Sequence, residues 1–470
     1  MNILYVGAGS FRFPSFVAQV LEHNRTSDAP IRGIWAVDVS PRAAAAARRV
    51  SDALLALAQV APGRGVELHW LGGPDLRPSD LPEDLSAMIV GIRAQGPGSR
   101  RTDEHIARRL GLMGQETVGI GGLAMALRNV PGVLGWARRV AELRPGAWIV
   151  NLTNPAGIVT QALADAGHER VVGVCDTPAE LSARTRAYLD RQGIRDAAPG
   201  YFGLNHLGYI VEVRRPGGAD ARDALPRTVQ AARAHSDYLA AFGEAYLATH
   251  RSLPSEYVLY YHLWRTLEQA PGAMTRARAV EELTRRFRAL GRGQEPSAVR
   301  SAYRGLLEER SRGYMRQELT AALAPPGERD RGELSGAGYA RIALEVLRCV
   351  SGLSREPLVL NLPLGAVAGI AVPAALGMGR DDVVETHVTL DPQGWRSALA
   401  RPPELEADAA ALVAEMKAYD RLAARAAAHL DRDAFFAAWW VNPLLRDVRV
   451  AERALAELVR AYPALGPLAR

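Results

Sequence analysis

The stretch Asn2-Ile-Leu-Tyr-Val-Gly7-Ala-Gly9-Ser10 decides the fold class of this chain. Its short apolar run is typical of a buried strand, and the glycine turn after it leads into a helical pattern that reaches about Leu21. A second strand is predicted over Ile34–Asp38, and it ends on an acidic residue. A strand, a tight turn and a helix at the head of an alternating pattern indicate a doubly wound α/β fold with a parallel sheet.

The same alternation continues to about residue 175 and then gives way to a different pattern. Further strands of the parallel sheet are predicted over Ala87–Gly91, Trp148–Asn151 and Val171–Cys175. From Tyr201 onward, long helical stretches from about Thr228 to Thr320 and from about Leu405 to Arg460 are mixed with strands at Tyr209–Arg214, Leu358–Asn361 and Val383–Leu390, and Ala324–Gly336 is loop-like. We therefore expect a Rossmann-like domain over 1–200 and a mixed α+β domain over 201–470.

Composition indicates an ordinary globular protein. Of 470 residues, 48% are hydrophobic and 23% charged, and no apolar run is long enough to predict a transmembrane helix. The N-terminus enters a strand at once without a basic region before it, so no secretory signal is predicted. Two cysteines are too few for a disulfide framework. These features predict a soluble, cytoplasmic protein with no membrane partner.

The basic residues do not predict nucleic-acid binding. The net charge is +6, but the arginines are spread along the chain, and Lys417 is the only lysine. The use of arginine in place of lysine along an Ala- and Arg-rich chain is typical of GC-rich coding. The tight basic pairs lack the interleaved aromatic residues of a single-strand binder. We expect a small-molecule ligand instead.

The glycine turn is a candidate dinucleotide site. Unpaired N–H groups at a helix N-terminus favour a pyrophosphate, and Asp38 is placed to accept hydrogen bonds from the ribose hydroxyls of NAD. Gly7, Gly9 and Ser10 form the turn, but Arg12 occupies the third glycine position of the motif. Glycine also occurs in such turns in proteins that bind no nucleotide. Asp38 at the end of the second strand favours dinucleotide binding.

Polar residues also follow the fourth and fifth predicted strands. Asn154, in an Asn-Pro turn, is a candidate for hydrogen bonds to a hydroxylated substrate, although such turns often only end a strand. Cys175-Asp176 and His206 are a second group. A buried cysteine is usually a small apolar residue, and the separation of Cys175 from His206 matches no zinc-finger spacing, so spacing alone disfavours a metal site.

Two further groups carry weaker signals. In the run Tyr257-Val-Leu-Tyr260-Tyr261, aromatic residues are most often core packing, and a tyrosine acts as a base only where a cation lowers its pKa. Arg93, Arg100 and Arg276 are candidate anion ligands, since forked guanidinium groups suit phosphate, although most arginines of this chain must be solvated.

Together these motifs are more specific than any one alone. They run in the order Arg93-x-x-Gly96-x-x-x-Arg100, Gly114-Gln115-Glu116-Thr117, Asn151-x-Thr153-Asn154-Pro155, Cys175-Asp176-x-Pro178, Gly203-Leu-Asn205-His206 and Tyr260-Tyr261. This order resembles the NAD- and metal-dependent glycoside hydrolases of family 4, the 6-phospho-glucosidases and their relatives. The similarity is dense from residue 1 to about 210 and thinner through Tyr257–Ala277 and Asn361–Leu390.

The resemblance implies a function and a role for each motif. It implies cleavage of 6-phospho-α- or 6-phospho-β-glucosides through transient oxidation at C3 by NAD, proton removal at C2 and elimination. Cys175 and His206 then match a divalent metal pair, usually binding manganese, and Asp176 matches the general acid. Tyr260 or Tyr261 matches the base, with Tyr260 favoured. The resemblance also implies that Arg93, Arg100, Glu116, Asn154 and Arg276 contact the substrate. It implies that the protein assembles as a homodimer or homotetramer.

Two other functions stay open from the sequence. A 2-hydroxy acid dehydrogenase would share the doubly wound start and the Asn-Pro turn, but it would leave the Cys-Asp and Asn-His motifs unexplained. A non-catalytic protein that senses NAD on the same scaffold is the third possibility. The anomer cleaved, and whether the substrate carries a phosphate, a carboxylate or neither, are also open.

Overall fold

The computed structural model describes residues 1–73, 75–236, 238–268, 276–313, 338–391 and 393–469. Its N-terminal half alternates strands and helices, as the sequence predicts. The elements of this half are β1 (Asn2–Val6), α1 (Phe13–Thr26), β2 (Gly33–Val37), α2 (Pro41–Ala56), β3 (Glu67–Trp70), β4 (Leu85–Val90), α3 (Gly98–Arg109), α4 (Gly119–Leu143), β5 (Trp148–Asn151), α5 (Ala156–Asp165), β6 (Val171–Gly173) and α6 (Thr177–Arg191).

The strands of this half form a parallel sheet in the order β3-β2-β1-β4-β5-β6. This is the strand order of dinucleotide-binding folds, in which the connections reverse direction between β1 and β4. Ligands of such folds bind at the carboxyl edge beside this reversal. The turns that follow β1, β2, β5 and β6 all lie along this edge, so the topology brings the predicted site residues to one place.

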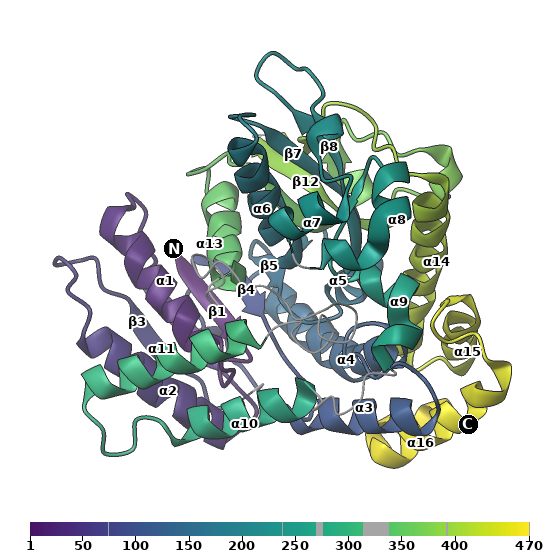
Figure 1. The fold of residues 1–470 in the computed structure, drawn as a ribbon. Coiled ribbons are helices and arrows are strands. Elements are labelled where there is room, and N and C mark those ends of the chain that lie inside the picture. The colour runs from purple at the N-terminus through teal and green to yellow at the C-terminus, as the bar shows by residue number, and fades with distance from the viewer. Residues whose placement is uncertain (74, 237, 269–275, 314–337, 392, 470) are drawn as a thin grey trace.

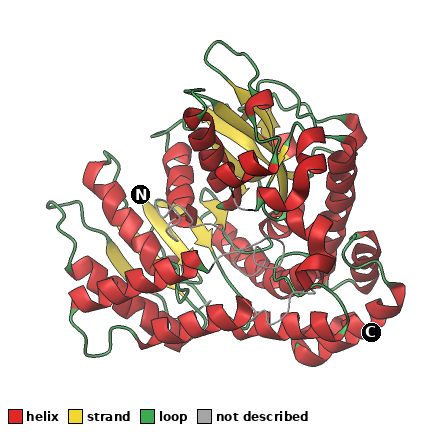
Figure 2. Cartoon of the chain, viewed as in Figure 1, coloured by secondary structure: helices red, strands yellow, loops and turns green. Residues whose placement is uncertain are grey.

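Alternate residues of β1 enter two different cores, because successive side chains of a strand point to opposite faces. Leu4 and Val6 pack with α4, α5 and α14 on one face of the sheet. Ile3 and Tyr5 pack with α1, α2 and α13 on the other. Figure 2 shows the yellow strands lying between red helices, which is the layering that a sheet buried on both faces requires.

The C-terminal half extends the same sheet with antiparallel strands. Asn361 of β10 pairs with Gly173 of β6, and the order continues β10-β12-β7-β8-β9. The elements are β7 (Ala198–Leu204), β8 (Leu207–Arg214), α7 (Val229–His235), α8 (Gly243–Thr249), β9 (Leu253–Pro254), α9 (Val258–Glu268), α10 (Arg276–Ala289), α11 (Pro296–Arg312), α13 (Gly338–Val350), β10 (Leu358–Pro363), β11 (Val367–Ala368), β12 (Val383–Asp391), β13 (Gly394–Ser397), α14 (Ala407–His429), α15 (Arg432–Val441) and α16 (Val448–Ala461). The chain thus has the predicted class, a doubly wound parallel sheet followed by a mixed α+β region.

Helices from the C-terminal half also cover the N-terminal one. Figure 1 shows α13 beside α1, and α10 and α11 beside α2. Short 3-10 helices complete the description: Pro78–Asp80, Arg222–Ala224, Leu239–Phe242, Leu364–Ala366, Ala374–Leu376 and Pro463–Ala469. Across the described ranges, no helix combines the length and the apolarity needed to span a bilayer.

The structure contains strands that the sequence does not predict: β3, β7, β9, β11 and β13. Strand β3 is short, and its first residue, Glu67, is exposed, so no apolar run predicts it. The stretch predicted as helical from about Thr228 is divided into several helices, and β9, which pairs with β8, lies between α8 and α9. The loop predicted over Ala324–Gly336 lies outside the described residues.

Candidate active site

A single cavity of about 1940 Å³ lies along the carboxyl edge of the parallel strands. Its lining includes eight predicted site residues: Gly7, Gly9, Ser10, Asp38, Arg93, Glu116, Asn154 and Asp176. Four others are buried and lie outside this described lining: Arg100, Cys175, His206 and Tyr260. The fold therefore gathers residues from six motifs, far apart in sequence, around one space large enough for a dinucleotide together with a sugar.

The glycine turn is shaped by close backbone contacts. Gly7 has a φ of +90°, and a Cβ there would lie 2.4 Å from the carbonyl oxygen of Gly91, so no other residue fits. The N–H of Gly9 donates to Asp38 Oδ2 at 2.9 Å, and the N–H of Ser40 donates to Oδ1 at 2.8 Å. Both oxygens of Asp38 are thereby fixed at the end of β2, and each keeps a lone pair for a further donor.

The structure explains the bulky residues after the glycine turn. The ring of Phe11 packs against Phe287 of α10 and Tyr303 of α11, with ring centroids 5.3 and 5.6 Å apart. The Tyr303 hydroxyl donates to the carbonyl oxygen of Phe11 at 2.8 Å and accepts from the N–H of Ser15 at 3.1 Å. These contacts join α10 and α11 to the glycine turn, and the glycine motif alone does not predict them.

Cys175 lies just after β6, and His206 lies in the turn between β7 and β8. Cys175 follows β6 and is 1% exposed, and burial together with Glu385 and Asp176 raises the pKa of its thiol well above the usual range. His206 occupies the tight turn between β7 and β8 with a φ of +63°, and its ring stacks on Tyr257 at 3.9 Å.

A buried carboxyl connects these two positions. Glu385 of β12 accepts hydrogen bonds from Asn205 at 3.2 Å, from Asn361 at 2.8 Å and from Tyr201 at 3.1 Å. Burial raises the pKa of Glu385 to about 7, although these hydrogen bonds lower it. Asn205 precedes His206 in the chain, and the charge of Glu385 acts on Cys175, so this network lies next to both predicted metal ligands. Over the described side chains, no group of three or more His, Cys, Asp or Glu is placed to hold a metal by itself.

The three neighbouring tyrosines have different surroundings. Tyr257 lines the cavity and is stacked on His206. Tyr260 is 2% exposed, and its ring lies 5.8 Å from that of Tyr257. The pKa of Tyr261 is raised well above its usual range by burial and by Asp420 of α14. Tyr257 belongs to the predicted motif, but only the structure shows that it is the member reaching the cavity.

The predicted arginines are engaged with carboxylates. Arg100 Nε lies 2.9 Å from Glu104 and its Nη1 lies 2.5 Å from Glu116, and the side chain is buried. Arg93 Nη1 is 3.3 Å from the same carboxylate of Glu116. Arg100 therefore holds Glu116 in place from behind the cavity wall, and Arg93 reaches the cavity itself. Arg276 begins α10, but its side chain lies outside the described residues.

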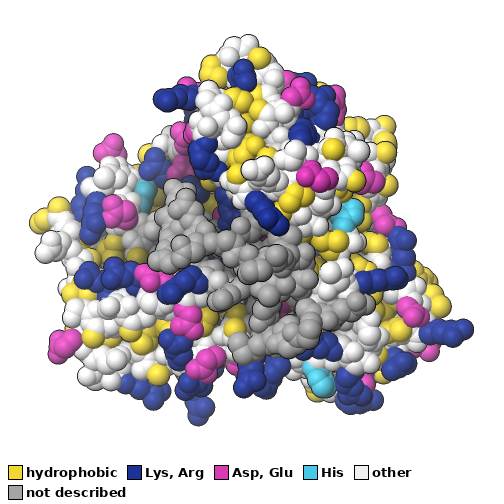
Figure 3. Space-filling model, in the orientation of Figure 1, with side chains coloured by type: hydrophobic (Ala, Val, Ile, Leu, Met, Phe, Trp, Pro, Cys, Tyr) yellow, Lys and Arg dark blue, Asp and Glu magenta, His cyan; other side chains and the backbone are white. Residues whose placement is uncertain are grey.

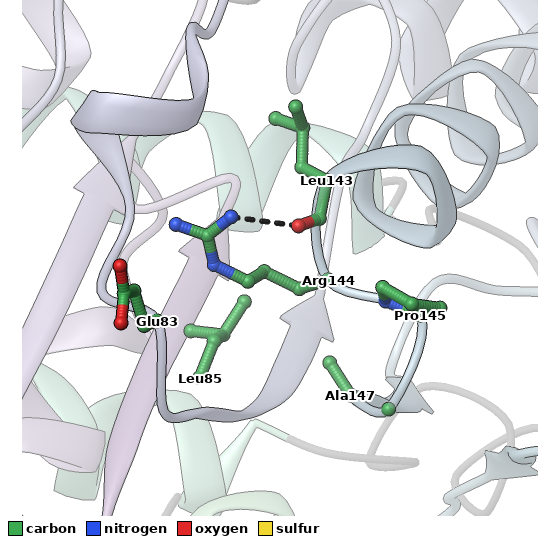
Figure 4. A pocket seen from close by; sticks show the side chains of 7 residues that line it. Glu83, Leu85, Leu143, Arg144, Pro145 and Ala147 are labelled. Atoms are coloured by element: carbon green, nitrogen blue, oxygen red, sulfur yellow. Dashed lines mark hydrogen bonds between the residues drawn. The ribbon is translucent and has the colours of Figure 1, made fainter.

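A second pocket, of about 300 Å³, lies at the opposite ends of β4 and β5 and carries no chemistry (Figure 4). Its one cation, Arg144, donates to the carbonyl oxygens of Leu143, Pro82, Pro78 and Leu81 at 2.6 to 2.8 Å. A guanidinium with these hydrogen bonds anchors the loop and has few N–H groups left to bind an anion. On the face drawn in Figure 3, blue arginine side chains are scattered among magenta acids, without a single basic patch.

A parallel sheet in this strand order, with a glycine turn and an acid at its carboxyl edge, places the protein in the dinucleotide-binding class of α/β folds. Residues 2–190 match the model of the family 4 glycosyl hydrolases, and residues 201–445 match that of the family 4 glycosyl hydrolase C-terminal domain. The chain belongs to glycosyl hydrolase family 4, as the order of its motifs predicts. Membership favours the glycosidase over the 2-hydroxy acid dehydrogenase.

Two relatives show how far the similarity extends. The chain is 30% identical to 6-phospho-alpha-glucosidase 1 of Lacticaseibacillus paracasei over 55% of this chain and 60% of that protein. It is 26% identical to a probable 6-phospho-beta-glucosidase of Bacillus subtilis over 99% of this chain and 97% of that one. The first match thus spans less than two thirds of the relative, whereas the second spans nearly all of it.

Solved structures share the fold across the whole chain. The 6-phospho-beta glucosidase of Thermotoga maritima, with manganese, NAD+ and glucose-6-phosphate, superposes with a TM-score of 0.74 at 22% identity, covering 99% of each chain. A 6-phospho-alpha-glucosidase from gut microorganisms, in complex with NAD and Mn2+, gives a TM-score of 0.74 at 20% identity and covers 99% of this chain and 98% of that one. At these identities the likeness shows the fold.

Proposed function

We propose that this protein is an NAD- and divalent-metal-dependent glycosidase that cleaves 6-phospho-glucosides. The observation that carries the proposal is one cavity that joins the glycine turn and Asp38 to Asp176, Tyr257 and Asn154. Membership of family 4 and the activities of the two relatives described above support the substrate class. The division into domains at 1–200 and 201–470 stays a prediction.

The residues present fit both cofactors. Gly7, Gly9 and Ser10 allow a dinucleotide backbone to approach, and the free lone pairs of Asp38 suit ribose hydroxyls. Cys175 and His206 offer a sulfur and a nitrogen donor, and two donors leave room in a metal's shell for substrate oxygens. When bound, NAD+ would supply a hydride acceptor, and the metal would supply a Lewis acid that makes a proton beside the oxidised carbon more acidic.

The chain's own side chains orient the sugar and move its protons. Asn154 Oδ1 is buried and, among described atoms, has no hydrogen-bond partner, which suits a sugar hydroxyl in the cavity. A tyrosine is proposed to remove the C2 proton. Of the three neighbouring tyrosines, Tyr257 lines the cavity, whereas burial raises the pKa of Tyr261 and makes it the weakest candidate. Arg93, with Arg276, is proposed to contact the phosphate, and Arg100 to position Glu116. Asp176, which lines the cavity just before α6, is proposed to act as the general acid for the leaving oxygen.

The test is nitrophenol release from α- and β-linked nitrophenyl 6-phosphoglucosides under reducing conditions, with NAD+ and Mn2+ each present or omitted. We expect release from one anomer only when both are present. Release that needs neither would overturn the mechanism. NADH accumulation with hydroxy acids would indicate a dehydrogenase, and tight NAD binding without turnover would indicate a sensor.

Asp38→Asn is expected to weaken NAD+ binding by about 10- to 100-fold, the value of one or two hydrogen bonds to a charged acceptor. An amide keeps one acceptor oxygen but presents an N–H group to the N–H of Gly9 or Ser40, so the turn also loosens. Titration calorimetry measures the change. Asp28→Asn, in an exposed loop after α1, is the control and should bind like the wild type.

We also infer a cytoplasmic enzyme that works as a homodimer or homotetramer. Both cysteines are free and buried, which suits a reducing compartment. Trp440 and Val448 expose 54% and 65% of their surface on α15 and α16, an apolar area that a second copy would cover. Light scattering after size exclusion tests the assembly.

A further inference from the structure

The glycine turn uses most of its own amide groups to hold its shape. Four N–H groups of the turn donate within the protein, namely those of Gly7, Ala8, Gly9 and Ser10. Their acceptors are the carbonyl oxygens of Val37 and Gly7 and the carboxylate of Asp38, at 2.9 to 3.1 Å. These groups are therefore not available to a ligand.

The first turn of α1 is occupied in the same way. The N–H groups of Phe13 and Phe16 donate to carbonyl oxygens of the preceding residues at 3.2 Å, and Pro14 has no N–H. The N–H of Ser15 donates to the Tyr303 hydroxyl at 3.1 Å. A side chain of α11 thus takes a donor that a helix N-terminus commonly offers to a phosphate.

Two N–H groups remain between residues 7 and 16. Those of Phe11 and Arg12 have no partner among the described atoms. They carry only partial positive charges, whereas each phosphate of a dinucleotide carries a full negative charge. Asp38 and Asp176 bring further negative charge to the same cavity. A full positive charge beside the turn would therefore stabilise a bound dinucleotide.

Arg12 is the cation that the chain places there. It directly precedes α1, it lines the cavity together with Gly9 and Ser10, and 34% of its side chain is exposed. The other arginines of the described lining lie at position 93 or later, so Arg12 alone among them belongs to the glycine turn. The glycine motif has an uncharged residue without a side chain at this position.

The Arg12 guanidinium is oriented by its neighbours but keeps donors for a ligand. It lies 4.2 Å from the centroid of the Tyr339 ring, and its Nη1 lies 3.5 Å from Asp176 Oδ2, which is long for a charge-assisted hydrogen bond. Its Nε and Nη2 have no partner among the described atoms. One edge of the guanidinium therefore keeps the pair of parallel N–H groups that suits two phosphate oxygens.

We infer that Arg12 binds the pyrophosphate of NAD through this edge, a role that rests on the NAD dependence of the proposed function. The N–H groups of Phe11 and Arg12 contribute the backbone donors. Tyr339 and Asp176 are positioning residues, because they hold the guanidinium. A side chain at the third position of the motif thus supplies the charge that this turn does not supply from its amide groups.

The test is the affinity of Arg12→Gln for NAD+ and for ADP-ribose, which keeps the pyrophosphate without the nicotinamide, by titration calorimetry at constant Mn2+. We expect both to bind about 10- to 100-fold more weakly, the value of charge-assisted hydrogen bonds. Adenosine, titrated by NMR, has no phosphate and should bind as it does to the wild type. Arg12→Lys should recover only part of the affinity, since an ammonium lacks the two parallel donors.

Arg285→Gln is the control, because it removes the same charge from another side chain that lines the cavity. It should bind NAD+ like the wild type. Equal losses in the two variants would show a general effect of charge and would overturn the inference. An equal loss of adenosine binding, or an unchanged affinity of Arg12→Gln for NAD+, would also overturn it.

A double variant separates contact from neutralisation. Without Arg12, an unpaired Asp176 carboxylate would repel an anion even if Arg12 never touched it. Arg12→Gln combined with Asp176→Asn removes that repulsion. If Arg12 contacts the pyrophosphate, the double variant still binds NAD+ weakly, and recovery of the wild-type affinity would overturn the inference.

Thermal unfolding gives a second readout. NAD+ should raise the melting temperature of the wild type by more than that of Arg12→Gln, because a ligand stabilises in proportion to its affinity. If Arg12→Gln does not fold, Arg12→Lys carries the same comparison with the charge kept. Wild type that binds neither NAD+ nor ADP-ribose would refute the proposed function itself, whereas tight binding by both wild type and Arg12→Gln would refute only the role of Arg12.

Discussion

Cys175→Ser is expected to lower kcat/KM for metal-dependent cleavage by at least about 10³-fold. A hydroxyl is a far poorer anionic donor than a thiolate, and polarisation of substrate oxygens by a metal contributes several kcal/mol to a transition state. The thiol is buried and its pKa is raised well above the usual range, so a bound cation would shift it toward the thiolate. Cleavage assays and free Mn2+ measured by electron paramagnetic resonance report the loss of activity and of metal separately.

The chain contains its own control for this substitution. Cys349 is also buried, at 3% exposure, but it lies near the end of α13, with Glu345, Arg348 and Ser354 around it, and outside the lining of the cavity. Cys349→Ser makes the same atomic change, so it should bind Mn2+ and cleave substrate like the wild type. If Cys175→Ser kept its Mn2+ affinity, or if both variants lost it equally, Cys175 would not be a metal ligand.

Asp103→Ala is expected to lower the free energy of unfolding by about 3–5 kcal/mol, the usual cost of leaving one partner of a buried ion pair alone. Arg128 Nη1 and Nη2 lie 2.9 and 2.5 Å from the two oxygens of Asp103. The Tyr462 hydroxyl donates to Asp103 at 2.6 Å, and its ring lies under the Arg128 guanidinium. Urea denaturation measures the change.

A more exposed ion pair that also starts from α3 is the control. Arg109 of α3 lies 3.2 Å from Glu457 of α16, and 56% of the arginine side chain is exposed. Arg109→Ala should cost less than about 1 kcal/mol, because water screens the pair. Similar losses from both substitutions would show that burial of the charge does not determine the cost.

Much of the N-terminal fold follows from local sequence. The apolar runs of β1, β4 and β5 and the glycine turn are signals within a few residues of one another, and the structure confirms them. Strand β3 gave no such signal, because its four residues include an exposed glutamate and it is held by pairing with β2. The continuation of the sheet through Asn361 depends on residues nearly two hundred positions from Gly173.

The family, the glycine turn with Asp38 after the second strand, and the position of Cys175 and Asp176 at the end of one strand can all be predicted from the residues alone. These features are encoded by residue type and short spacing, which a chain carries before it folds. The fold was needed to show that, of the three neighbouring tyrosines, Tyr257 lines the cavity. It placed Arg100 against Glu104 and Glu116, and it placed Glu180 beside Asp176 and Glu256. The charge and the proton affinity of a side chain depend on neighbours brought in from distant segments, so the protonation of this site is a property of the folded chain.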